Sequence, residues 1–153
     1  MLFRSYGNDA LQDAKKHNHN KKANLIEEKL IELRTNNANY LTELLSKVDQ
    51  ITTPKISSDR KSNFMLYTIR VKSGKKTRDR LQDFLTKKKI QTKVIYEPIH
   101  FTEFYKKKFG YKKGILKNTE KVSDEILSLP MYPNLKKEEI RFIADSILEF
   151  FEK

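Results

Sequence analysis

The chain has 153 residues, the size of one domain, and its 32 Lys and Arg residues against 20 Asp and Glu residues give a net charge of +12. It has no cysteine, which excludes disulfides, thiolate catalysis and zinc–cysteine sites and fits a reducing, cytoplasmic setting. Hydrophobic residues make up only 37% of the chain, so we expect a small core, and no apolar run approaches the roughly 18 residues of a membrane span.

The first part of the chain is polar and the part that follows is strongly periodic. Residues 1–24 are aperiodic, and we interpret them as an arm or loop ahead of one domain over residues 25–153. Apolar residues recur at helical spacing over residues 25–48, which predicts a long helix with one buried face. Three asparagines, Asn36, Asn37 and Asn39, weaken the middle of this helix, so the sequence leaves both a continuous helix and a kink or break there as possible outcomes.

A strand, a helix and a second strand are predicted next. A loop around Pro54 and residues 57–63 precedes residues 64–71, which are rich in β-branched and aromatic side chains and predict a central strand. Thr77 can cap a helix that runs to Lys88, with Leu81, Phe84 and Leu85 facing inward. Residues 92–96 predict the second strand, which stops before Pro98.

The C-terminal third predicts two short helices, a short strand and a long helix. The first helix covers residues 102–109 and is closed by Gly110, and the second covers residues 119–127 with Val122 and Ile126 inward. Residues 127–129 predict a third strand. The last helix has the clearest apolar spacing, carried by Ile140, Ile143, Ala144, Ile147, Leu148 and Phe151. A small sheet with helices packed on it accounts for this order, which predicts an α/β or α+β fold.

His100 is the sharpest single candidate for a functional side chain. It follows Pro98 at a strand-to-helix junction, where an imidazole can point into a cleft and donate a hydrogen bond to a phosphate or a hydroxyl. The alternative is a histidine bonded to the local backbone. A weaker signal is the pair His17 and His19, where a metal site competes with a solvated loop that has no nearby acidic ligand.

A basic and aromatic run over residues 105–111 leaves two interpretations open. Aromatic faces stack on bases and lysines meet phosphates, so this run and the net charge could belong to a module that binds nucleic acid or another polyanion. The same spacing suits an amphipathic helix and turn. The absence of a dense basic face within any one helix makes nucleic acid the less favoured partner.

Two stretches carry a family resemblance, KVIYEPIHFTEFY at residues 93–105 and ILSLPMYP at residues 126–133. Together they resemble the C-terminal domain of the DegT/StrS-type sugar aminotransferases, which use pyridoxal phosphate. The resemblance runs from about residue 2 to residue 151 and is most specific over residues 64–133. It implies the small C-terminal domain of a fold-type-I aminotransferase, with a short, mainly antiparallel sheet. It also implies amino transfer from glutamate to a keto-sugar nucleotide in the complete enzyme.

The resemblance also implies roles for particular residues. His100, Tyr96 and Tyr105 match positions that shape the sugar-nucleotide pocket, so we expect a partly exposed His100 beside a concave surface that Tyr96 also lines. Asn18 or Asn20 matches an asparagine that reaches the cofactor phosphate of the neighbouring subunit, although lysines follow here where the family has an arginine.

The resemblance does not include the domain that carries the cofactor lysine. We therefore expect a truncated or split member that is inactive alone and holds no pyridoxal phosphate by itself. A chain with the large domain, or a homodimer, is the expected partner. The helix face with Ile26, Leu30 and Leu33 is expected to lie partly in that interface.

Overall fold

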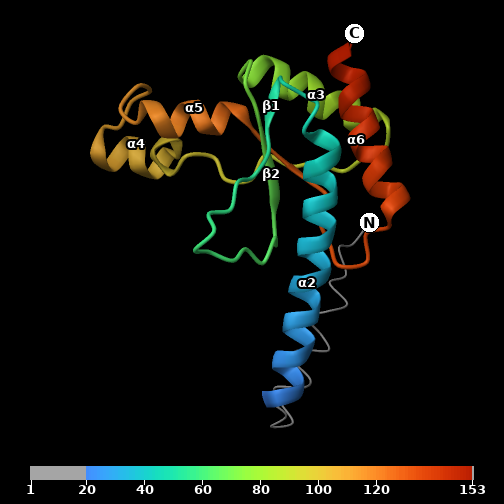
Figure 1. Cartoon of the computed structure of the whole chain (residues 1–153). Helices are drawn as coiled ribbons and strands as arrows, with labels where there is room; N and C mark the ends of the chain where they lie inside the picture. Colours follow the sequence, from blue (N-terminus) through green and yellow to red (C-terminus); the bar gives the residue numbers. More distant parts are fainter. Residues whose placement is uncertain (1–19, 153) are drawn as a thin grey trace.

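The computed structural model describes residues 20–152 of the chain (Figure 1). Five α-helices, one 3-10 helix and three strands are described in this range. In chain order they are α2 (Asn20–Leu45), β1 (Ile51–Thr52), β2 (Tyr67–Val71), α3 (Lys75–Lys87), η1 (Ile99–Phe101), α4 (Glu103–Phe109), α5 (Lys117–Glu125), β3 (Ile126–Leu129) and α6 (Lys137–Glu152). None of the helices in this range combines the length and the hydropathy needed to cross a bilayer.

The strands form one antiparallel sheet in the order β1, β2, β3. β2 is the central strand, as predicted, and its register places Ile69 opposite Leu127. The strand starts three residues later than predicted, because Phe64 has a left-handed φ of 43° that extended backbone does not allow. The two-residue strand β1 was not predicted, because two residues are too few to show an alternation of apolar and polar side chains.

The strand predicted over residues 92–96 is wrong. Only Lys93 pairs with the sheet: its N–H donates to the Ser128 carbonyl at 3.1 Å, and the Ser128 N–H donates to the Lys93 carbonyl at 2.8 Å. Three residues later the chain turns, because Tyr96 has a φ of 66°. An aromatic residue adopts this left-handed conformation rarely, and it ends any extended run.

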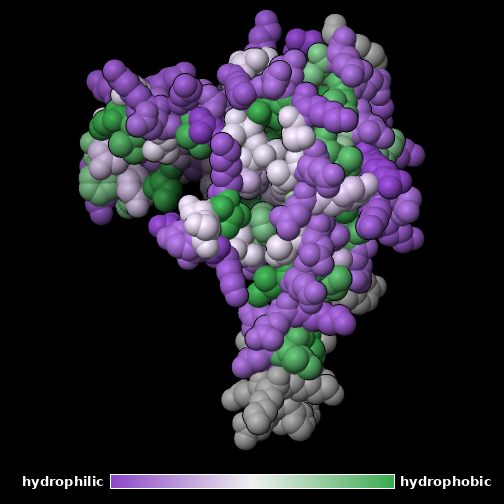
Figure 2. Space-filling model, in the orientation of Figure 1, coloured by the Kyte–Doolittle hydropathy of each residue, from purple (hydrophilic) through white to green (hydrophobic). Residues whose placement is uncertain are grey.

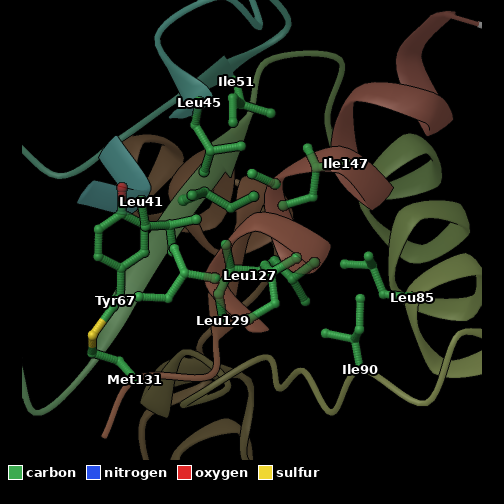
Figure 3. Close-up of a cluster of buried hydrophobic side chains, with 14 of the residues drawn as sticks. Leu41, Leu45, Ile51, Tyr67, Leu85, Ile90, Leu127, Leu129, Met131 and Ile147 are labelled. Carbon is green, nitrogen blue, oxygen red and sulfur yellow. The ribbon is translucent and has the colours of Figure 1, made fainter. Parts of the chain in front are cut away.

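Three helices cover one face of the sheet and enclose the core (Figures 1 and 3). Alternate residues of β2 are buried and face these helices, namely Tyr67, Ile69 and Val71. They pack against buried side chains of α2, α3 and α6 that include Leu41, Leu45, Leu81, Leu85, Ile140 and Ile147. The Tyr67 hydroxyl lies 2.7 Å from Thr42 Oγ1, so this buried hydroxyl keeps a hydrogen-bond partner.

The long helix α2 begins at Asn20, five residues earlier than predicted, and it runs unbroken through its three central asparagines. Asn37 explains part of this continuity. Its Nδ2 donates to the carbonyl of Tyr132 at 3.0 Å and to that of Pro133 at 3.2 Å, which fastens the helix to the turn after β3. Such tertiary bonds outweigh a propensity deficit of a few tenths of a kcal/mol per asparagine.

The predictions for the helices α3 and α6 differ in their accuracy. α6 buries Ile140, Ile143, Ala144 and Ile147, as its spacing predicts. In α3 the predicted cap is wrong: the helix starts at Lys75 after Gly74, which has a φ of 78°, and Thr77 lies within the first turn. Glycine reaches that backbone conformation without strain, so the turn needs no capping side chain.

Candidate functional site

The segment over residues 97–125, which we call the side lobe, stands beside the sheet and away from α2 and α6 (Figure 1). It contains η1, α4 and α5. α4 ends at Gly110, as predicted, with a φ of 67° and a hydrogen bond from the Gly110 N–H to the Lys106 carbonyl at 3.0 Å. The lobe packs little against the core, because α4 buries none of its residues.

Two arginines fasten the C-terminal end of α5 to the sheet and to α3. Arg70 of β2 donates from Nε and Nη2 to Glu125 Oε2, at 2.9 Å and 2.5 Å. The buried Arg78 of α3 donates from Nη1 to the Ile126 carbonyl at 3.1 Å and pairs with Asp79. A cation at a helix C-terminus also meets the negative end of the helix dipole. The helix that carries much of the site is therefore anchored at one end.

An open cavity of about 770 Å³ lies within the side lobe and brings three sequence-predicted residues together: Tyr96, His100 and Tyr105 all line it. Its other lining residues come from the loop before η1, η1 itself, the turn after α4, α5 and the start of β3: Ile95, Glu97, Pro98, Ile99, Tyr111, Leu116, Asn118, Thr119, Val122, Ser123 and Ile126. Val122 was predicted to face the core, but it is exposed toward this cavity instead. The walls are largely apolar, and Figure 2 shows hydrophobic surface on the lower side of the lobe.

His100 is more deeply buried than the sequence suggested, with 4% of its surface exposed. Its Nε2 lies 3.2 Å from Oε1 of Glu120, a side chain of α5 that is also buried. The ring packs against Phe101, with ring centroids 4.3 Å apart. The expectation of a partly exposed histidine is therefore wrong, because a residue twenty positions later closes over one edge of the ring. The alternative, a bond to the local backbone alone, does not hold either.

Glu120 holds four hydrogen bonds in this small space. The Gly114 N–H donates to Oε1 and Oε2 at 2.8 Å and 2.9 Å, and the Leu116 N–H donates to Oε1 at 3.3 Å. Burial acts to raise the pKa of the Glu120 carboxyl, but the hydrogen bonds from Gly114, Leu116 and His100 outweigh it, so the pKa lies below its ordinary value. Glu120 is thus a carboxylate at neutral pH.

The tyrosines provide the exposed side of the cavity. Tyr96 is 82% exposed, and its left-handed backbone turns the side chain out of the line of the preceding residues. Tyr105 and Tyr111 stack with their ring planes 17° apart and their centroids 6.4 Å apart. The left-handed backbone of Tyr96 costs about 1–3 kcal/mol, and strained conformations of this kind are often kept at functional sites.

Sequence reasoning missed Glu120, the residue that organises the site. A signal was present: an acidic side chain in the first turn of a helix, after a glycine turn, can accept the free N–H groups of the helix start. The pairing with His100 left no such signal, because the two residues meet only through the folding of the lobe.

The residues predicted to reach a cofactor or a metal lie outside or at the edge of the described part of the chain. Asn18 lies outside the described residues, and Asn20 is described only as the first residue of α2. Neither a lysine nor an arginine lines the cavity, so its residues do not fit pyridoxal phosphate, which needs a Schiff-base lysine and a phosphate site. His17 and His19 also lie outside the described residues, among which no cluster of potential metal ligands occurs.

The basic and aromatic run of α4 interacts largely with itself. Lys107 pairs with Glu103 at 3.2 Å, and Lys108 Nζ lies 5.3 Å from the Phe104 ring centroid and 5.6 Å from that of Phe109. Aromatic rings that already stack on one another offer less free face to a base. This geometry favours the amphipathic helix over the nucleic-acid interpretation.

Comparisons with known proteins agree on one family. The model of the DegT/DnrJ/EryC1/StrS aminotransferase family matches residues 26–148. The chain is 39% identical over 123 residues to a pleiotropic regulatory protein of Geobacillus stearothermophilus, covering 78% of this chain and 32% of the relative.

Solved structures show the same fold. A DegT DnrJ EryC1 StrS aminotransferase from Brucella abortus superposes with a TM-score of 0.72 and 28% identity, covering 86% of this chain and 34% of that one. Helicobacter pylori PseC, an aminotransferase involved in pseudoaminic acid biosynthesis, gives a TM-score of 0.75 and 27% identity, covering 88% and 35%. The chain thus spans about a third of the length of these relatives.

Proposed function

The chain belongs to the DegT/DnrJ/EryC1/StrS aminotransferase family, and from that premise we propose that it forms one wall of the substrate pocket of a sugar-nucleotide aminotransferase. In the complete enzyme an amino group would pass from glutamate to a keto-sugar nucleotide. The observation that carries this proposal is the cavity of the side lobe, in which Tyr96, His100 and Tyr105 meet.

The chemistry of the cavity suits a sugar. Its volume of about 770 Å³ lies within the roughly 300–1,000 Å³ of small-molecule sites. Apolar walls with a few polar groups are typical of such sites, and the tyrosine rings offer flat faces to the apolar side of a sugar ring. The likeness to Helicobacter pylori PseC, an aminotransferase involved in pseudoaminic acid biosynthesis, supports this substrate class.

Pyridoxal phosphate, when bound to a complete enzyme, supplies the electron sink for amino transfer. Since the cavity provides no lysine and no cation for a phosphate, we propose that another part of the enzyme holds the cofactor. That part would be a large domain, present as a partner chain or in a homodimer of a longer polypeptide. The 153-residue chain alone would then bind substrate weakly and transfer no amino group.

The test combines this chain with a domain that carries the cofactor lysine. The 153-residue chain is co-expressed with the lysine-bearing domain of a DegT/StrS-type aminotransferase, and amino transfer from glutamate to a keto-sugar nucleotide is measured. Activity should require both chains. Tyr96→Ala should raise KM about tenfold, equivalent to roughly 1.4 kcal/mol of lost binding.

The control is Met65→Ala, at a side chain that is 65% exposed in the loop before β2, which should leave KM unchanged. Absence of activity with both chains present, or an unchanged KM in Tyr96→Ala, would contradict the proposal. Retention of the chain on nucleic acid with a steep dependence on salt would support the polyanion alternative instead.

A further inference from the structure

We propose that Glu120 is a positioning residue that fixes the His100 imidazole as its Nε2–H tautomer, so that the ring offers Nδ1, a hydrogen-bond acceptor, to the ligand of the cavity. The assignment of a sugar as that ligand rests on the proposed function. The tautomer itself follows from the contacts of the two side chains and holds for any ligand.

The first step is the charge state of Glu120. Both carboxylate oxygens accept hydrogen bonds from backbone N–H groups, which can only donate. The Gly114 N–H donates to both oxygens, and the Leu116 N–H donates to Oε1. A proton on either oxygen would face one of these donors, at a contact of 2.8–2.9 Å for Gly114. The backbone therefore selects the ionised form, which accepts hydrogen bonds and donates none.

The second step is the tautomer of His100. An acceptor-only carboxylate at 3.2 Å from Nε2 requires that Nε2 carry the hydrogen. In the neutral ring Nδ1 then has none, because one nitrogen donates and the other accepts. The inference therefore replaces the donor role that the sequence suggested for this histidine, toward a phosphate or a hydroxyl, with an acceptor role at Nδ1.

The third step is rigidity. His100 lies on η1 and Glu120 on α5, so their contact joins the two sides of the cavity. α5 is itself anchored by Arg70 and Arg78. A neutral Nδ1 held in this way pairs with a ligand hydroxyl, which donates, and not with a phosphate oxygen, which only accepts. Glu97, which also lines the cavity, adds a second acidic group that disfavours a phosphate there.

Nitrogen-15 NMR on the full 153-residue chain measures the tautomer directly. The chain has three histidines, and the signals of His100 are identified by their loss in His100→Gln. In the neutral ring, we expect a pyrrole-type Nε2 that carries the hydrogen and a pyridine-type Nδ1 that carries none. A protonated Nδ1 in the unsubstituted chain overturns the inference.

A pair of matched variants tests whether Glu120 is the cause. Glu120→Gln should abolish the strong preference for Nε2–H, while Glu97→Gln, which removes the same charge from an exposed residue of the same cavity, should leave it unchanged. A preserved preference in a folded Glu120→Gln chain would overturn the positioning role. The result is independent of amino transfer, so failure of the proposed function and failure of this inference are separately visible.

Discussion

The contact between His100 and Glu120 makes each side chain depend on the other. A buried carboxylate is tolerated where donors surround it, and here an imidazole and two backbone N–H groups do so. Removing the imidazole leaves a space and one donor fewer, and removing the carboxylate leaves several donors without an acceptor. Both changes act on the residues that line the cavity, so stability and site geometry are linked at this pair.

His100→Ala should therefore destabilise the chain, whereas the same substitution at an exposed histidine would change the stability little. We expect a loss of about 1–3 kcal/mol, because a buried partner loses its hydrogen bond and the truncated side chain leaves a void. Urea unfolding measures it. Tyr96→Ala, at an exposed side chain of the same cavity, should change stability by no more than about 0.5 kcal/mol. Equal stability of the two variants would show that the His100 contact contributes nothing.

The Glu120 carboxyl should make stability fall on acidification. Its pKa in the folded chain lies below the ordinary value of 4.5, since the hydrogen bonds outweigh the effect of burial. Its contribution is therefore fully present above that value and is lost as the pH falls through the lowered folded pKa. The advantage of the unsubstituted chain over Glu120→Gln should shrink as the pH falls below about 4.5 and through the lowered folded pKa. An advantage that stays constant in urea unfolding over this range would contradict the lowered pKa.

At the scale of elements, side-chain periodicity predicted the long helices, and β-branched and aromatic composition predicted the central strand. α6 and β2 show why: α6 buries apolar side chains at helical spacing, and β2 buries alternate residues. The predicted strand over residues 92–96 has the same kind of composition, but its fate depends on the backbone of Tyr96 and on a single paired residue, Lys93. Tertiary contacts decide such a segment, and local sequence does not show them.

β3 should be sensitive to truncation of its fully buried side chain. Leu127 is fully buried between β2 and the helices, so Leu127→Ala should cost about 2–5 kcal/mol. Denaturant unfolding should show a lower midpoint with an unchanged slope. Met65→Ala, outside the core, serves as the matched control and should stay within about 0.5 kcal/mol. A small effect at Leu127 would mean that the sheet repacks around the lost side chain.

At the scale of the whole molecule, the core could be predicted from the sequence more completely than the side lobe. The core was predictable because α2, β2 and α6 carry their burial pattern in their own sequence. The predicted site residues Tyr96, His100 and Tyr105 could be chosen from a motif, but their shared cavity and the partner Glu120 arise from the folded lobe. Pairing between distant polar side chains leaves no periodic signal, so sequence alone does not reveal it.

The exposed surface of the side lobe leads to a last prediction, about association. Ile99 is 64% exposed and Ile115 is 54% exposed, and the lower side of the lobe is hydrophobic in Figure 2. The face of α2 with Ile26, Leu30 and Leu33, expected to lie in an interface, is half-buried within this chain. The lobe is thus the more exposed apolar surface, and such patches commonly drive association when no partner covers them.

We expect the 153-residue chain to sediment above its monomer mass of 18.2 kDa at high concentration. The double variant Ile99→Ser, Ile115→Ser should shift it toward that mass, because the hydroxyls remove apolar area from the lobe and leave the core intact. Met65→Ser, also at an exposed side chain but outside the lobe, should sediment like the unsubstituted chain. A chain that remains monomeric at every concentration would contradict the predicted association. A Met65→Ser variant that dissociates as readily as the double variant would show that the side lobe is not the associating surface.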